Sequence, residues 1–169
     1  RDADGLTALH VACEAGHLEI AKILLREGFA NVDMRAGAES TGGAARFARG
    51  PGPAGSSPSA AALEGMAPLH IACAKGNMPL VRMLLGKPNE ASSDITCATR
   101  GATAFIYACM YGQLSTATSL VEEGLCRPQI RDSLGYTALH AAAENGHEAV
   151  VQYLLSLPVL WLNAQDSLG

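Results

Sequence analysis

The sequence is poor in the features that several common classes of protein require. Aromatic residues make up 5% of its 169 residues and charged residues 17%, and the net charge is −4 with an isoelectric point near 5.7. Such a chain lacks the basic surface that nonspecific binding to nucleic acid or to an anionic membrane needs. No apolar run approaches the roughly 18–20 residues that cross a bilayer. We therefore expect neither nucleic-acid binding nor membrane insertion.

The motifs of common enzyme classes are also missing. There is no Cys-x-x-Cys pair, no cluster with zinc-ligand spacing, no nucleophile elbow and no glycine loop that would cradle a phosphate. We expect no metal, no cofactor and no small-molecule substrate, and we predict that the chain is not an enzyme. The five cysteines are an odd number. Reduced thiols favour an intracellular location, cytoplasmic or nuclear.

What the chain does contain is one pattern repeated four times. Aligning the sequence with itself gives copies 60, 96 and 130 residues after the first, so that successive steps are 60, 36 and 34 residues. Two glycine positions keep this register throughout. They are Gly5, Gly65, Gly101 and Gly135, and Gly16, Gly76, Gly112 and Gly146. Internal periodicity of this length is typical of solenoid proteins.

The repeated words are TALH, APLH, TAFI and TALH, and six residues after each word ends comes Gly-His, Gly-Asn, Gly-Gln or Gly-His. With a period of 33–34 residues they resemble the ankyrin repeat, whose signature is a turn Asp and Gly, T-P-L-H-x-A, Gly-His and an apolar helix. The resemblance implies an all-α solenoid of stacked helix-turn-helix units joined by β-turn or hairpin loops. It covers the chain apart from one long insertion and the loop spacers.

The residues support the same architecture independently. Thr7 is suited to cap a helix over 8–15, and Gly16 to end it in the left-handed region. A second helix is expected at 18–27, with later pairs near 67–75 and 78–86, 103–111 and 114–123, and 138–145 and 148–157. Pairs this short cannot bury an apolar face alone, so they must stack.

We predict a single domain with repeats at about 2–35, 62–97, 98–131 and 132–165. The long first step comes from 27 extra residues at 36–62, of which 22 are Ala, Gly, Ser or Pro. Such a composition cannot offset its own ordering entropy, so a disordered insertion is expected there. It is either inert or a tethered binding segment. The word DSLG at 132–135 returns at 166–169, which predicts the start of a further repeat and a fragment of a longer array.

The histidines at fixed spacing have three possible roles. A metal site needs three or four converging ligands, and a catalytic site needs a partner group beside the imidazole. Stacked copies would hold equivalent histidines apart, and the third copy has Ile106 and Gln113 at these places. A Thr hydroxyl and an imidazole three residues apart can instead bond each other. We therefore predict structural roles for Thr7, His10, Gly16, His17, His70, Thr103, Thr137, His140, Gly146 and His147.

The cysteines and the variable positions lead to two further expectations. Cys13, Cys73 and Cys109 share one position that Ala143 fills in the fourth copy, which predicts a small buried slot. Similarity to ankyrin repeats implies that a protein partner binds the concave face and the loop tips. The positions so implied, here called the edge positions, are Asp4, Leu6, Glu14, Leu63, Glu64, Met66, Lys75, Arg100, Met110, Tyr111, Leu134, Tyr136, Glu144 and Asn145. Several are apolar or aromatic, as in protein interfaces.

The sequence therefore predicts a non-catalytic scaffold that binds a protein partner. The alternative is a regulatory or substrate-recruiting segment of a larger enzyme, because nothing in these residues reports on a catalytic domain elsewhere in the parent chain.

Overall fold

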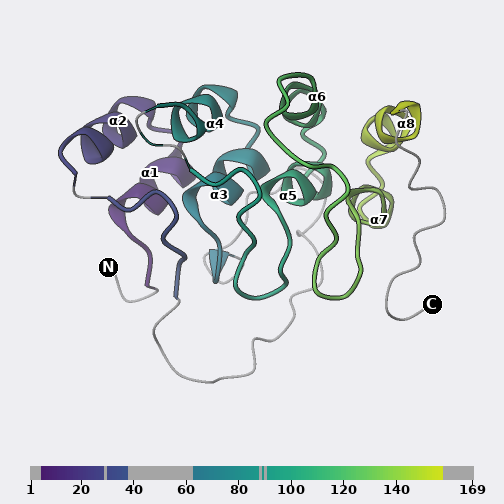
Figure 1. Ribbon diagram of the computed structural model, residues 1–169, viewed down its shortest axis with the longest axis horizontal. Helices are drawn as coiled ribbons and strands as arrows, with labels where there is room; N and C mark the ends of the chain where they lie inside the picture. The colour runs from purple at the N-terminus through teal and green to yellow at the C-terminus, as the bar shows by residue number, and fades with distance from the viewer. Residues whose placement is uncertain (1–4, 29, 38–62, 88, 90, 158–169) are drawn as a thin grey trace.

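The computed structural model describes residues 5–28, 30–37, 63–87, 89 and 91–157 of the chain. Within these residues eight helices follow one another in four pairs (Figure 1). The pairs are α1 (Ala8–Ala15) with α2 (Leu18–Arg26), α3 (Pro68–Ala74) with α4 (Met78–Leu85), α5 (Ala104–Met110) with α6 (Leu114–Glu122), and α7 (Ala138–Glu144) with α8 (Glu148–Ser156). Every one of these helices was predicted, and each bound lies within one or two residues of its predicted place.

The helices form two rows. The first helices of the pairs, α1, α3, α5 and α7, pack against one another in sequence order and make one row, and the second helices lie above them (Figure 1). Loops project from the first row on the side away from the second helices. The all-α solenoid expected from the repeats is therefore confirmed.

The loops are held together by backbone bonds between neighbouring repeats. Ala36 donates its N–H to the carbonyl of Met66 at 2.8 Å, and Gly65 donates back to the carbonyl of Ala36 at 2.8 Å. Gly37 bonds the carbonyl of Gly5 at 3.3 Å. These bonds join the residues on either side of the predicted insertion to each other and to the first repeat. Residues 38–62 lie outside the described residues, as does the predicted start of a further repeat at 166–169.

One core runs through all four pairs. Leu9, Leu69 and Phe105 hold the same register position in the first three copies and are buried, whereas Leu139 at this position in the fourth copy is half-buried. The cysteines of the predicted small slot, Cys13, Cys73 and Cys109, are buried free thiols. Burial raises the pKa of Cys13 to about 12, so this thiol is an unreactive core residue. No helix in the described part of the chain is long and apolar enough to span a membrane.

Candidate functional site

The imidazole of His10 joins two repeats. Its Nδ1 accepts the hydroxyl proton of Thr7 at 2.7 Å and the backbone N–H of Thr7 at 3.1 Å, and its Nε2 donates to the carbonyl of Met66 at 3.0 Å. The Thr7 hydroxyl in turn accepts the N–H of His10 at 3.4 Å and so caps α1. The ring thus uses one acceptor and one donor nitrogen, which is the inventory of a neutral imidazole.

The same arrangement returns in the second copy with one change. His70 accepts the N–H of Ala67 at 3.0 Å and donates to the carbonyl of Ala102 in the next repeat at 3.2 Å. Ala67 has no hydroxyl, so the second bond to Nδ1 is lost. The edge of the His70 ring packs on Tyr107 with ring centroids 5.4 Å apart. Burial lowers the pKa of His70 to about 4.

The third and fourth copies keep the cap. The hydroxyl of Thr103 accepts the N–H of Ile106 at 3.4 Å, so this helix is capped although no histidine is present. Thr137 and His140 repeat the first pair, with 2.8 Å between Oγ1 and Nδ1. The predicted bond between threonine and imidazole is thus present wherever both residues occur.

The polar residue directly after the turn glycine bonds the preceding repeat, whereas His10 and His70 bond the following one. His147 donates from Nε2 to the carbonyl of Met110 in the preceding repeat at 2.9 Å, and Gln113 donates to the carbonyl of Ala74 at 3.1 Å. Gln113 therefore replaces histidine without loss of the bond. His17, the first-copy residue at this position, is exposed and caps α2 without a side-chain bond.

These tertiary bonds occupy the polar atoms that catalysis or metal binding would use. The hydrogen bonds described above join the imidazoles of His10, His70, His140 and His147 to backbone groups or to a threonine hydroxyl. Within the described residues no group of three or more His, Cys, Asp or Glu side chains is placed to hold a metal ion.

Four of the predicted edge positions are buried, so the expectation that they face solvent is wrong. Leu6, Leu63, Met66 and Met110 all belong to the hydrophobic core. The reason is the gain from removing a large apolar side chain from water, about 25 cal/mol for each Å². For two of them the backbone carbonyl is also engaged, because the carbonyls of Met66 and Met110 accept hydrogen bonds from His10 and His147 of other repeats.

The other described edge positions reach the surface. Glu64, Leu134 and Glu144 are exposed, and the remainder are half-buried: Glu14, Lys75, Arg100, Tyr111, Tyr136 and Asn145. Leu134 is 38% exposed. Asn145 donates to the carbonyl of Ala141 at 2.8 Å. Asp4 lies outside the described residues.

Five of these surface and neighbouring side chains form a cluster between the third and fourth repeats. We call it the edge cluster; its members are Arg100, Asp132, Tyr136, His140 and Glu144. Arg100 lies over the ring of Tyr136, 5.4 Å from its centroid, and pairs with Asp132 at 3.4 Å. Tyr136 stacks on His140 with centroids 5.2 Å apart and donates its hydroxyl to Glu144. The ring of Tyr136 is therefore held by contacts with both a cation and an imidazole.

Asp132 bonds both the backbone and Arg100 within the edge cluster, and it was not among the site residues predicted from the sequence. Its carboxylate accepts the N–H of Leu134 at 2.9 Å and of Tyr136 at 2.8 Å, in addition to the guanidinium of Arg100. The aspartate at the start of DSLG was a usable signal, because an Asp two residues before a turn position bonds the following backbone. Burial and the bond to Glu144 together raise the pKa of Tyr136, so its hydroxyl remains a donor at neutral pH.

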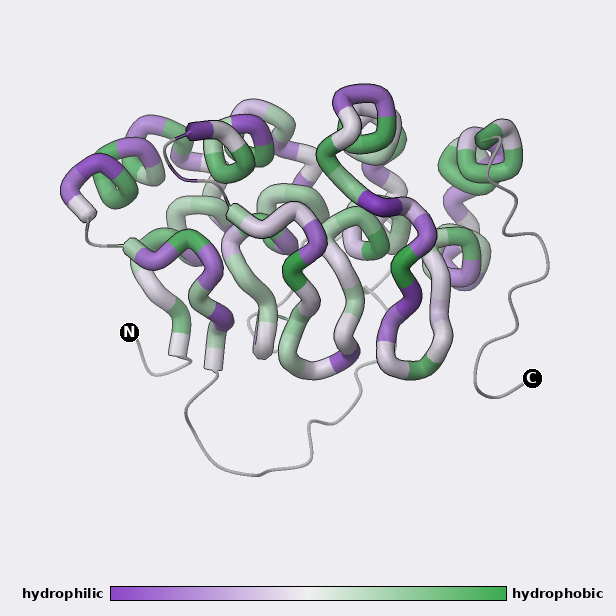
Figure 2. Tube along the Cα trace, viewed as in Figure 1, coloured by the Kyte–Doolittle hydropathy of each residue, from purple (hydrophilic) through white to green (hydrophobic). Residues whose placement is uncertain are grey.

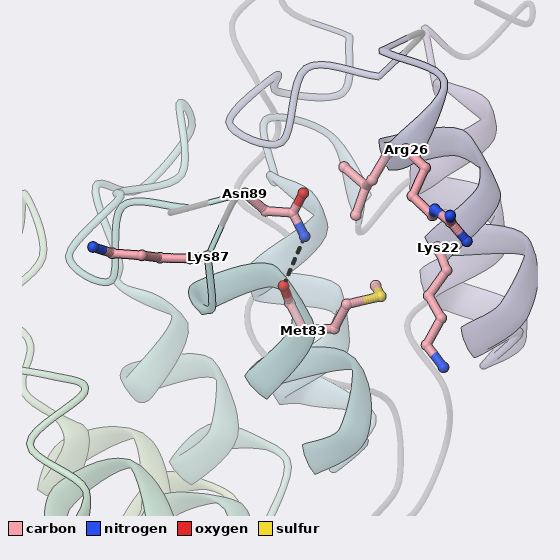
Figure 3. A pocket seen from close by; sticks show the side chains of 6 residues that line it. Lys22, Arg26, Met83, Lys87 and Asn89 are labelled. Atoms are coloured by element: carbon pink, nitrogen blue, oxygen red, sulfur yellow. Dashed lines mark hydrogen bonds between the residues drawn. The ribbon is translucent and has the colours of Figure 1, made fainter.

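A separate cleft of about 370 Å³ opens between α2 and α4, on the opposite side of the repeats (Figure 3). Lys22 and Arg26 line one wall, and Met83, Lys87 and Asn89 line the other. Lys22 is already paired with Glu19 at 2.7 Å, and Asn89 donates to the carbonyl of Met83 at 2.9 Å. The walls come from the ends of two helices, where the backbone carbonyls disfavour an anion. The cleft therefore offers no organised ligand site.

The comparison with known proteins agrees with this geometry. A family model described as ankyrin repeats in three copies matches residues 1–91, 49–129 and 69–163. The ankyrin repeat and KH domain-containing protein mask-1 of Caenorhabditis elegans is 32% identical over 169 residues, covering 95% of this chain and 6% of that protein. The E3 ubiquitin-protein ligase XBAT33 of Arabidopsis thaliana is 37% identical over 105 residues, covering 60% of this chain and 20% of that protein.

A third relative is the human transient receptor potential cation channel subfamily A member 1, which is 34% identical over 109 residues, or 59% of this chain and 9% of the channel. The chain thus spans a fifth or less of the length of these three relatives. What they share with it is the repeat itself. With its four helix pairs, its capped Thr-x-x-His turns and matches that together run from residue 1 to 163, the chain belongs to the ankyrin-repeat family.

Proposed function

We propose that this chain is a non-catalytic protein-binding module that recognises its partner at the edge positions of the third and fourth repeats. The observation that carries the proposal is the edge cluster. A tyrosine ring fixed between a guanidinium and an imidazole is already ordered before a partner arrives, so binding loses little side-chain entropy there. Tyrosine and arginine are also the residues that most often dominate protein interfaces.

The surroundings of the cluster fit a partner with apolar and basic groups. Leu134 offers exposed apolar surface beside it, and Tyr111 is half-buried at the end of α5. Among the edge positions, Glu64 and Glu144 are exposed and negatively charged, and the half-buried Lys75 is positively charged. The positive charge of Arg100 is already paired with Asp132. The remaining charge at the edge is therefore acidic. An intracellular protein, cytoplasmic or nuclear, is the expected partner, rather than nucleic acid or a small molecule.

A matched pair of charge reversals tests this assignment. Glu144 at the end of α7 and Glu148 at the start of α8 are both exposed glutamates of the fourth repeat, but only Glu144 belongs to the edge cluster. Proteins retained by the immobilised chain from a lysate of the cells that produce it should be retained at least about fivefold less by Glu144→Lys, because central interface residues contribute more than about 1 kcal/mol each. Glu148→Lys should retain them normally.

The result that contradicts the proposal is equal retention by the two folded variants. Circular dichroism on both variants separates loss of binding from loss of the fold. Leu134→Ser adds an independent check, because its side chain reaches solvent and its removal leaves the hydrogen bonds of Asp132 in place.

A second candidate is that the chain recruits substrates for a larger enzyme. It is favoured by the similarity to proteins named as E3 ubiquitin-protein ligases, which include XBAT33 and the rice protein XBOS32. If the parent protein is such a ligase, the proteins retained by this chain should acquire ubiquitin in a reaction reconstituted with the full-length protein. The modification should fall when that protein carries Glu144→Lys. If the bound proteins do not acquire ubiquitin, only the scaffold role remains supported.

A further inference from the structure

The four helices of the second row do not contact one another equally. α2 packs on α4 and α6 packs on α8, whereas α4 and α6 make little contact with each other although they are neighbours in the row (Figure 1). The first row is continuous at the same point, because α3 packs closely on α5. We call the facing surfaces of α4 and α6 the seam.

The face that α6 turns toward α4 is polar. Met83 identifies this face, because it lines the cleft between α2 and α4 together with Lys22 and Arg26 of the preceding helix. The residue of α6 in the register of Met83 is Ser119, and the residue one turn earlier on the same face is Thr116. Figure 2 shows α5 as hydrophobic almost throughout, whereas hydrophilic residues interrupt α6.

The other three copies carry apolar or aromatic side chains at these two positions. The pairs are Ile20 and Ile23, Leu80 and Met83, and Val150 and Tyr153. With Thr116 and Ser119 in their place, the seam has less apolar surface to hold α6 against α4. The hydroxyl of Thr116 is fully buried and has no hydrogen-bond partner among the described residues, so a closed seam leaves this group unsatisfied.

An ion pair spans the seam at its surface. Arg82 of α4 donates to Oε1 of Glu123, the residue directly after α6, from Nη2 at 2.6 Å and from Nε at 3.2 Å. The two side chains are 58% and 37% exposed. Salt weakens an exposed pair of this kind. The seam is therefore closed by a contact that depends on the solution, whereas apolar side chains face the preceding helix at the other junctions of the row.

We propose that the second row opens and closes at the seam, with α3 and α5 as the pivot and the ion pair of Arg82 and Glu123 as the contact that holds it closed. Opening exposes the hydroxyl of Thr116 to water, which removes the cost of leaving it unsatisfied. The bond from His70 to the carbonyl of Ala102 at 3.2 Å keeps the first row joined. The motion changes the curvature of the stack between the second and third repeats, and it does not depend on where a partner binds.

Distances between spin labels test the proposal. Pro79, Ser115 and Ala149 hold one register in α4, α6 and α8, and all three are exposed. Labels attached through p-acetylphenylalanine at 79 and 115 span the seam without using the native cysteines, and labels at 115 and 149 span the junction of α6 with α8.

The distance across the seam should respond to the ion pair. In the Glu123→Arg chain the distance between labels 79 and 115 should lengthen by at least about 3 Å, because a helix about 10 Å from the pivot moves that far when it rotates by about 20°. Salt at about 1 M, where the Debye length is about 3 Å, should lengthen it in the wild-type chain, which needs no substitution of the pair. Double electron–electron resonance measures both changes.

Two further variants make the test specific. Arg82→Glu combined with Glu123→Arg restores opposite charges and should restore the short distance. Glu122→Arg, exposed on the same helix but outside the ion pair, should leave the distance unchanged, and labels 115 and 149 should keep theirs throughout. A constant distance across the seam in the folded Glu123→Arg chain and at high salt would overturn the proposal. So would equal lengthening at both junctions, because the whole row would then be loosening.

Discussion

At the scale of the residue, the histidines of this chain work as neutral hydrogen-bonding bridges. His70 accepts a backbone N–H at Nδ1 and donates at Nε2 to the carbonyl of Ala102. A second proton would have to sit on Nδ1, where the N–H of Ala67 already points. Burial outweighs the bond from Nε2 to the carbonyl of Ala102, which favours the charged ring, and the pKa of His70 falls to about 4 from its ordinary value of 6.5.

This depressed pKa makes the fold sensitive to acid. The unfolded chain binds a proton at His70 below pH 6.5, whereas the folded chain does so only near pH 4. The contribution of His70 to stability is therefore complete above pH 6.5 and is lost as the pH falls toward 4, by roughly 3 kcal/mol. Urea unfolding at pH 7, 5.5 and 4.5 measures this loss.

His70→Ile provides the control for the acid dependence, because isoleucine occupies the equivalent place in the third repeat as Ile106. The variant should be less stable than the wild type at pH 7 but should lose less stability between pH 7 and 4.5. An equal loss in both proteins would show that other groups are responsible.

Thr116 gives a second prediction at this scale. Its side chain is fully buried in α6, and its hydroxyl has no hydrogen-bond partner. Thr116→Val keeps the branched shape and removes the unsatisfied group, so we expect a gain of about 1 kcal/mol in the free energy of unfolding. Urea titration measures it, with exposed Ser115→Ala on the same helix as the control. A destabilised Thr116→Val variant would mean that the hydroxyl is bonded in solution.

At the scale of the element, the turn between the two helices of a repeat depends on glycine where the next repeat comes close. Gly112 has φ of 71°, and a Cβ there would lie 2.6 Å from Nδ1 of His147, the ring that bonds the carbonyl of Met110. Gly124 has a similar φ of 65° but no neighbour within 4 Å of a Cβ. The two glycines thus share the backbone requirement and differ in the contact.

Alanine substitutions at Gly124 and Gly112 separate the free-energy cost of the left-handed backbone from the cost of the close contact. Gly124→Ala should lower the free energy of unfolding by about 1 kcal/mol, which is the usual cost of an alanine in the left-handed region. Gly112→Ala should lose at least about 1 kcal/mol more, because His147 must also move and its inter-repeat bond weakens. Thermal and urea unfolding of the two variants measure the difference. Equal losses would mean that the His147 ring adjusts freely.

The helices themselves could be predicted from the sequence because the information for them is local. Thr7 and Gly16 mark the start and end of α1, and the same registers mark the later helices. The small buried slot was predicted correctly for Cys13, Cys73 and Cys109, but Ala143 at the same position in the fourth copy is exposed. Each of these inferences needed only spacing and residue type.

The exposure of the edge positions could not be predicted in the same way. Whether Met66 or Met110 faces solvent depends on the packing of neighbouring repeats, which register alone does not contain. Asp132 was missed for a related reason. Its importance lies in a contact with Arg100 across 32 residues, and this contact appears only when the third and fourth repeats are stacked.

At the scale of the whole molecule, the four repeats act as a stack whose polar ties run between neighbours. His10 and His70 bond forward to the next repeat, and Gln113 and His147 bond back to the preceding one. These ties fix the spacing of the loops and of the first-helix ends that carry the edge positions. The edge cluster therefore lies at a junction between repeats whose spacing these bonds set.

The central claim is that a protein partner contacts the chain at the edge of the third and fourth repeats. Its most direct test is site-specific photo-crosslinking with benzoylphenylalanine at Tyr111 or Leu134, and at the exposed Gln152 of α8 as the outer-helix control. We expect discrete adducts with the same protein from Tyr111 and Leu134 and none from Gln152. Adducts from Gln152 alone, or equal adducts from all three positions, would contradict it.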